Sequence, residues 1–167
     1  MPFTPFHMGA GILLKGILQS SFSLMIFGWS QIIMDIQPLV VILTENGHLH
    51  GFSHTYIGAI LLAIFSGFSG KYLSEFILNL LNISKRKNPI IITWRVVFIS
   101  ASLGTFSHVL LDSIMHGDIE PFYPFSTSNQ LLEIITTTQL HKYLLYCGLI
   151  GAGIYYIIQI VYSRLKR

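Results

Sequence analysis

The stretch from residue 104 to 118 combines an apolar run with side chains that can bind a metal or carry a proton. His108 and Asp112 are four residues apart, and His116 and Asp118 follow where the run ends. On a helix, positions i and i+4 share one face, so the imidazole and the carboxylate would point the same way. Ionisable side chains are costly at membrane depth and mark functional sites there. The pattern indicates a metal site or, alternatively, a hydrogen-bonded pair at a helix end.

The composition assigns the chain to the integral membrane class. Of 167 residues, 52% are hydrophobic and only 10% are charged, whereas about a quarter of a soluble domain is charged. This length predicts a single membrane-embedded domain over residues 1–167. The lone cysteine, Cys147, excludes a disulfide framework and a thiolate zinc site. The short, isolated basic clusters argue against a nucleic-acid partner.

Five apolar segments are separated by polar residues and glycine or proline. They cover residues 6–18, 22–43, 53–81, 89–116 and 142–162. We therefore predict an all-α, polytopic transmembrane bundle of four to five membrane segments, with Ser53 as the N-cap of the third. The first segment is shorter than the ~20 residues that a spanning helix needs, so we expect it to enter only part of the membrane.

Lysine and arginine predict the orientation of the bundle. Basic residues cluster at 85–87 and at the C-terminal end, positions that the positive-inside rule assigns to the cytoplasm. The start of the third segment and the end of the fourth then face the extracytoplasmic side of the cell (inner) membrane. All seven histidines map to that same side. Because the orientation uses only lysine and arginine, this gathering of histidines is an independent indication of a site there.

Five side chains on four segments form the predicted metal site. They are His7, Asp35, His54, His108 and Asp112. Imidazole and carboxylate are ligands that zinc and similar divalent ions accept, and burying these groups without a cation would be costly. We predict one or two divalent ions, most simply zinc, with Asp112 or Asp35 as the bridging carboxylate of a two-ion site. Such ions lower the pKa of a water molecule and hold a phosphoryl or acyl oxygen.

The remaining polar residues at this end receive secondary roles. His116 and Asp118 are predicted to be catalytic proton carriers or hydrogen-bond partners of the ligands. His48 and His50 lie in a glycine-containing loop, where we expect one or both to be exposed, and His141 is expected to be structural. The aromatic, proline-containing connection that begins at Asp118 is expected to form a wall or lid over the site.

Several short motifs together resemble a known family. They are Pro5-Phe6-His7-x-Gly9, Met34-Asp35-Ile36-x-Pro38, His50-Gly51-x-x-His54-Thr55, Ser107-His108-x-Leu110-Leu111-Asp112-Ser113 and Asp118-Ile119-x-Pro121-Phe122-x-Pro124-Phe125. In this combination the chain resembles the small membrane-bound, metal-dependent hydrolases typified by YdjM. The resemblance touches most of the chain apart from its last helix, and it implies a metal site more firmly than any particular reaction.

A fainter similarity is to the zinc-dependent phospholipase C and P1 nuclease class. Those enzymes also combine an early histidine, an aspartate, a further histidine and a late HxxxD motif. The similarity implies one ion on His7, another on Asp35, His54 and His108, and Asp112 between them. The chain departs from that class in lacking an N-terminal tryptophan ligand and an HxxxE motif, which puts a third ion and phosphodiester specificity in doubt.

These observations predict a membrane-bound hydrolase that cleaves a phosphoester of a lipid or lipid-linked substrate through a zinc-activated water. Two alternatives stay open. A divalent-metal transporter would need polar residues towards the cytoplasmic end, where the sequence offers little beyond Lys15, Gln31 and Lys71. A non-catalytic scaffold stabilised by metal would have a closed coordination sphere.

Overall fold

The computed structural model describes residues 5–81 and 90–165, and within these ranges it is all-helical. The helices are α1 (His7–Leu18), α2 (Leu24–Thr44), α3 (Tyr56–Leu80), α4 (Trp94–Met115) and α5 (Thr137–Leu165). The last four are long and apolar enough to cross a membrane, whereas α1 has 12 residues. The predicted polytopic helical bundle is thereby confirmed. The basic cluster at 85–87 and the last two residues, on which the predicted orientation depends, lie outside the described residues.

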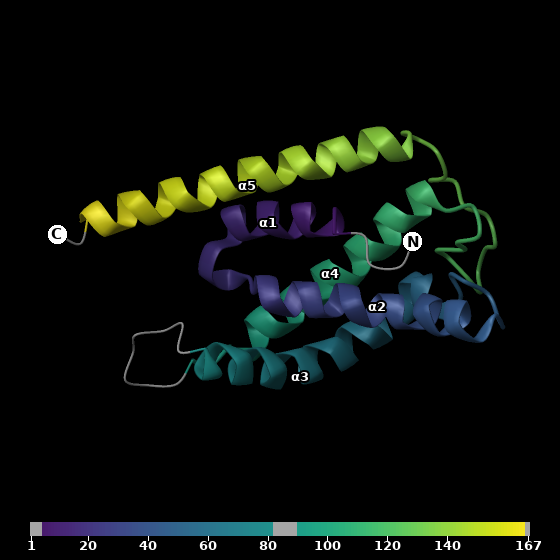
Figure 1. The fold of residues 1–167 in the computed structure, drawn as a ribbon, viewed down its shortest axis with the longest axis horizontal. Coiled ribbons are helices and arrows are strands. Elements are labelled where there is room, and N and C mark those ends of the chain that lie inside the picture. The colour runs from purple at the N-terminus through teal and green to yellow at the C-terminus, as the bar shows by residue number, and fades with distance from the viewer. Residues whose placement is uncertain (1–4, 82–89, 166–167) are drawn as a thin grey trace.

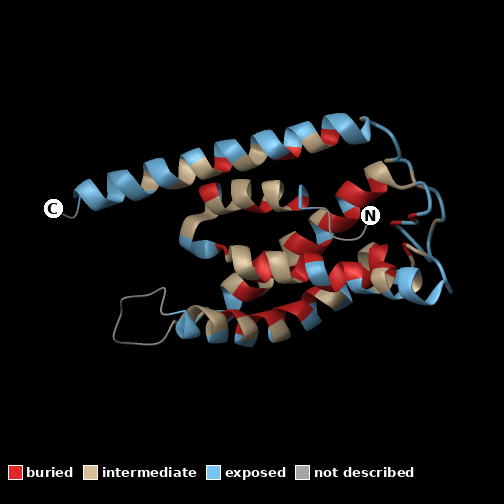
Figure 2. Cartoon of the chain, in the orientation of Figure 1, coloured by how far each residue is buried: buried red, intermediate tan, exposed pale blue. Residues whose placement is uncertain are grey.

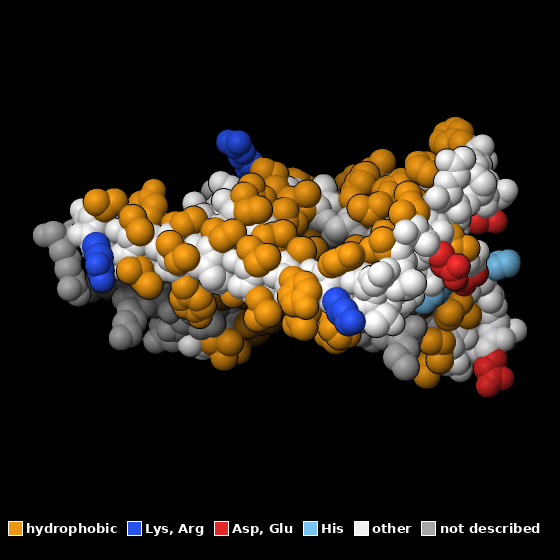
Figure 3. Space-filling model, turned by 90° about the horizontal axis from the view of Figure 1, so that it is seen from above, with side chains coloured by type: hydrophobic (Ala, Val, Ile, Leu, Met, Phe, Trp, Pro, Cys, Tyr) orange, Lys and Arg blue, Asp and Glu red, His pale blue; other side chains and the backbone are white. Residues whose placement is uncertain are grey.

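Successive helices alternate in direction along the bundle (Figure 1). The start of α1 and the α2–α3 and α4–α5 connections lie towards one end, and the C-terminus lies at the other. Buried residues concentrate on α2, α3 and α4, whereas most of α5 is exposed (Figure 2). From the side of α5, hydrophobic side chains cover most of the surface and acidic and histidine side chains appear at one end (Figure 3). On this face the acidic and histidine side chains therefore lie at the end that carries the two connections, whereas lysine and arginine side chains are spread along it.

The contact between α2 and α4 depends on Gly104. A Cβ at this position would lie 1.8 Å from the Ser30 hydroxyl and 3.2 Å from the Phe27 carbonyl oxygen. The Gly104 carbonyl in turn accepts a hydrogen bond of 2.9 Å from the Gln31 side chain. This close approach places the next turns of the two helices, which carry Asp35 and His108, opposite each other.

The third predicted segment begins differently from expectation. Residues Phe52–His54 form a short 3-10 helix, η2, and α3 starts at Tyr56. Its N-cap is Thr55, whose hydroxyl accepts a hydrogen bond of 2.9 Å from the Gly58 amide. The prediction that Ser53 caps this helix is wrong, because the Ser53 hydroxyl contacts the Nδ1 atom of His54 at 2.9 Å instead.

The last helix begins five residues before the predicted boundary at residue 142. Thr136 and Gln139 form a capping box at its start: the Gln139 amide donates to the Thr136 hydroxyl at 3.3 Å, and the Gln139 side chain accepts from the Thr136 amide at 3.2 Å. This reciprocal arrangement satisfies two amides that the first turn of a helix leaves free. The polar run before residue 142 is therefore the first turn of α5.

Candidate metal centre

The structure brings the five predicted ligands together around the carboxylate of Asp112. One oxygen, Oδ1, lies 3.2 Å from His7 Nε2 on α1. The other, Oδ2, lies 3.4 Å from His54 Nε2 on η2 and 3.1 Å from His108 Nε2 on α4. Asp35 on α2 approaches the same His108 nitrogen, with its Oδ1 at 3.3 Å. All five residues are buried, so four separate elements deliver nitrogen and oxygen donors to one solvent-excluded point.

The imidazole nitrogens at this point have no hydrogen-bond partner. The Nε2 atoms of His7, His54 and His108 are buried and make no hydrogen bond to any described residue. Buried polar atoms are nearly always satisfied, and an exception calls for a reason. A lone pair on any of these nitrogens would be repelled by the facing carboxylate unless a positive charge lay between them. The arrangement is that expected of a cation-binding centre.

The protonation of His108 follows from its neighbours. Gln31 Nε2 donates to the Gly104 carbonyl, which turns Gln31 Oε1 towards His108 Nδ1 at 2.7 Å. Because an amide oxygen only accepts, Nδ1 is the protonated nitrogen and Nε2 of a neutral ring carries the lone pair. Metal-binding histidines are commonly oriented by an acceptor on their other nitrogen in this way. Gln31 therefore directs a lone pair of His108 at Asp35 and Asp112.

Four of the residues form the inner group: Asp35, His54, His108 and Asp112. One donor atom from each lies within 4.8 Å of the other three. Imidazole and carboxylate donors in this number fit a divalent ion such as zinc. Burial lowers the pKa of His54 against the opposing influence of the Asp112 carboxylate, which favours the neutral, ligating form of the ring. The residues present therefore fit one divalent ion, with His7 held on the second oxygen of Asp112.

The two predicted proton carriers, His116 and Asp118, lie beside this centre. Together with His50 they form a second cluster, which we call the outer group. The Nδ1 atom of His50 is 2.9 Å from both carboxylate oxygens of Asp118. The His50 ring stacks on His116 with centroids 4.4 Å apart and meets the ring of His54 edge-on at 4.9 Å. Although partial burial opposes ionisation, the hydrogen bond from His50 lowers the pKa of Asp118. Burial, together with the charge of His50, lowers the pKa of His116.

The three histidines without a predicted site role, His48, His50 and His141, have different surroundings in the structure. His48 is exposed, in line with the expectation that one of the loop pair faces solvent, but His50 is buried with 8% of its surface accessible. His141 lies apart from both groups, where its ring stacks on Phe6 at 4.5 Å. The inner and outer groups thus contain five of the seven histidines when His7 is counted with the inner group.

Gln31 and His50 were missed as site residues. Gln31 precedes Asp35 by four positions and so shares its helix face, which is a signal that the sequence contains. His50 precedes His54 by the same spacing, within the motif His50-Gly51-x-x-His54-Thr55. Neither signal was decisive, because an amide and a loop histidine are usually solvent-exposed.

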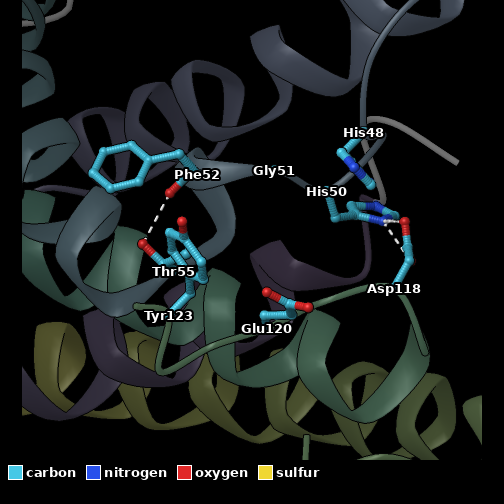
Figure 4. A pocket seen from close by; sticks show the side chains of 8 residues that line it. All are labelled: His48, His50, Gly51, Phe52, Thr55, Asp118, Glu120 and Tyr123. Atoms are coloured by element: carbon cyan, nitrogen blue, oxygen red, sulfur yellow. Dashed lines mark hydrogen bonds and ion pairs between the residues drawn. The ribbon is translucent and has the colours of Figure 1, made fainter. Parts of the chain in front are cut away.

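A cavity of about 290 Å³ opens at the end of the bundle beside the outer group (Figure 4). His50 and Asp118 line it on one side, and Glu120, Tyr123 and Thr55 line it on the other. Three of these residues come from the connection after α4, which the sequence predicts as a wall over the site. The outer group is therefore open to polar molecules from the end of the bundle.

A second, mostly apolar cavity of about 350 Å³ opens between α1 and α2. His7, Gln31 and Asp35 lie at its polar side, and its other lining residues are Pro5, Met8, Gly28 and Ile32. One of its walls is α2, which is a candidate membrane span. The side cavity thus borders the inner group at Asp35 and its neighbour His7, whereas the cavity at the end of the bundle borders the outer group.

Comparison with known proteins agrees with this architecture. No curated protein and no solved structure matches the chain significantly. The sequence model of one family, described as YdjM inner membrane protein, matches residues 8–165, a range that includes nearly all of the candidate centre. With its four apolar helices, the chain is a multi-pass membrane protein that belongs to the YdjM inner membrane protein family.

Proposed function

We propose that this protein is a membrane-bound, metal-dependent hydrolase that cleaves a phosphoester of a lipid or lipid-linked substrate. The observation that carries the proposal is the set of buried, unbonded Nε2 atoms of His7, His54 and His108 facing the carboxylates of Asp35 and Asp112. A divalent ion held there would lower the pKa of a water molecule and polarise a phosphoryl oxygen. We propose zinc, because the donors combine imidazole with carboxylate.

The cavity between α1 and α2 supports a lipid substrate. Its apolar walls, including Met8 and Ile32, suit an acyl or isoprenoid chain, and its polar side ends at His7 and Asp35. A molecule with a chain in this cavity would place a phosphate group at the inner group. The polar cavity at the end of the bundle leaves room for a head group or for water.

The role of the chain's own residues is to bind and orient. Gln31 holds His108 in the ligating tautomer, and Asp112 offers its two oxygens to imidazoles from three elements. That Asp112 bridges two ions, and that His116 and Asp118 carry protons, stay predictions from the sequence.

We further propose that the site faces the extracytoplasmic side, on the strength of the lysine and arginine distribution. A single cysteine at the exposed Thr127 of the α4–α5 connection, in a Cys147→Ser background, tests this orientation. A membrane-impermeant maleimide should label Thr127→Cys in intact cells. Labelling only after permeabilisation would reverse the orientation.

A transporter is less well supported, because the polar side chains towards the other end bond locally. Lys15 donates to the carbonyls of Gln19 and Phe22, each at 2.8 Å, and Lys71 pairs with Glu75. Both lysines are therefore bonded within their own end of the bundle.

A metal-stabilised scaffold is the second candidate, favoured by one observation. The inner group offers four protein donors, which can complete the tetrahedral sphere of a structural zinc ion. A catalytic site instead keeps a position open for water or substrate. The two candidates therefore differ in whether the bound ion accepts an outside ligand.

The test uses the full chain purified in detergent and loaded with zinc. We expect phosphate or phosphoalcohol release from at least one of a panel of phospholipids and isoprenoid phosphates, abolished by chelator and by His108→Ala. Thr127→Ala, which changes an exposed residue of the α4–α5 connection outside both cavities, should retain activity. A zinc-loaded protein that hydrolyses none of the panel and binds no inorganic phosphate would instead establish the scaffold.

A further inference from the structure

We infer that the outer group, His50, His116 and Asp118, binds a second divalent ion next to the inner group. One donor atom from each of the three residues lies within 4.8 Å of the other two. Two imidazoles and one carboxylate are a ligand set that zinc and related ions use in sites that keep a position open. None of the three belongs to the inner group, and together they form a separate constellation.

The geometry of the rings allows one ion to be shared. His50 and His116 stack with an angle of 28° between their planes, and one nitrogen of each ring lies within 4.8 Å of the other and of an Asp118 oxygen. Asp118 is at the edge of His50, with both oxygens 2.9 Å from Nδ1. Among the described residues, no lysine or arginine forms an ion pair with Asp118, so no other fixed cation occupies this position.

His116 is held in place although it follows the last residue of α4. Its backbone amide donates to the Asp112 carbonyl at 2.8 Å. The Asn129 side chain donates to the carbonyls of Ser113 at 2.8 Å and His116 at 3.3 Å. These bonds tie the end of α4 to the following connection. They fix the backbone of His116 without any bound ion.

The outer group is adjacent to the inner group through His50 and His54, whose ring centroids are 4.9 Å apart. Both His50 and Asp118 line the polar cavity at the end of the bundle, which gives an ion a path from water. The outer ion should therefore bind more weakly and exchange faster than an ion in the inner group. In this arrangement His116 and Asp118 are ligands rather than proton carriers.

The test counts and locates ions in the full chain in detergent, after chelator treatment and titration with Mn²⁺ or Zn²⁺ alone. We expect the wild type to bind two equivalents, one tight and one weaker. His116→Ala and Asp118→Asn should keep the tight equivalent and weaken the other at least tenfold. His48→Ala, a histidine lining the same cavity outside the outer group, should keep both.

Electron paramagnetic resonance of the Mn²⁺-loaded protein supplies a readout independent of activity. Two neighbouring ions should give a spin-coupled signal in the wild type and an isolated-ion signal in His116→Ala. One equivalent in the wild type, or a second equivalent of unchanged affinity in His116→Ala, would overturn the inference. So would loss of the tight ion in a folded His116→Ala protein, because the outer residues would then serve the inner centre.

The same titration separates this inference from the proposed function. Asp112→Asn should lose the tight equivalent and retain the weaker one. A wild type with only the tight ion defeats the second site and leaves the hydrolase proposal standing. A wild-type protein that binds two ions but hydrolyses no substrate supports the second site and defeats the hydrolase proposal.

Discussion

The inner and outer groups use the same two side-chain types but are built differently. Three of the four inner residues sit on spanning helices, and none of the four side chains is more than 8% exposed. The outer group draws all three residues from outside the helices, and the Asp118 side chain is 49% exposed. Helix packing fixes most of the inner donors in advance, whereas the connections at the end of the bundle leave Asp118 exposed and His116 partly exposed. The same chemistry can therefore give a tight site and an exchangeable one a few ångströms apart.

Loss of the Asp112 carboxylate should break the inner group most severely. Asp112→Asn removes the one charged group that contacts three imidazoles. We expect metal affinity at the inner group to fall at least ~100-fold, beyond the range seen when only a partner of a ligand is lost. Metal content by elemental analysis after gel filtration measures this. Asp118→Asn is the matched control, and equal losses in the two variants would remove the distinction between the groups.

Gly104→Ala should disturb the inner group through the backbone. The added methyl group would meet the Ser30 hydroxyl at 1.8 Å and force α2 and α4 apart. Overpacking of this kind costs about 1–3 kcal/mol, so we expect a lower Tm and weaker metal binding. Gly153→Ala is the control, because a Cβ there meets no atom within 4 Å. Unchanged thermal stability of Gly104→Ala would contradict the close approach of the two helices.

Gln31→Leu should weaken the inner group without removing a ligand. The variant loses the acceptor that holds the His108 tautomer, and changes of this type cost about 10–100-fold in metal affinity. Competition with a chromophoric chelator measures the change. Gln31→Glu, which keeps an acceptor oxygen, should bind the ion nearly as well as the wild type. If both variants bind normally, the orientation of His108 does not depend on Gln31.

The smallest effect is expected from a change that touches neither group. Thr136→Ala removes one half of the capping box at the start of α5, and loss of an N-cap costs about 1 kcal/mol. A small drop in Tm with unchanged metal content should result. Thr138→Ala, two residues along the same exposed turn, serves as the control. A loss of metal from Thr136→Ala would show that α5 supports the groups more directly than its contacts indicate.

Much of the architecture could be predicted from local sequence. Apolar runs of spanning length predict α2, α3, α4 and α5, because a membrane leaves helices as the simplest way to satisfy backbone polar groups. The four-residue spacing of His108 and Asp112 predicts their shared face, and the alternation of helix direction predicts a common end for distant histidines. The start of α5 was placed too late, although Thr136 and Gln139 have the spacing of a capping box.

Only the tertiary structure decided how the donors are aimed and which of them are buried. His108 and its acceptor Gln31 are 77 residues apart, and His50 and Asp118 are 68 residues apart. Hydropathy and periodicity describe one segment at a time, so they determine which residue types reach this end of the bundle. Which nitrogen carries the proton, and which loop histidine turns inwards, depend on contacts between segments that are formed only when the helices pack.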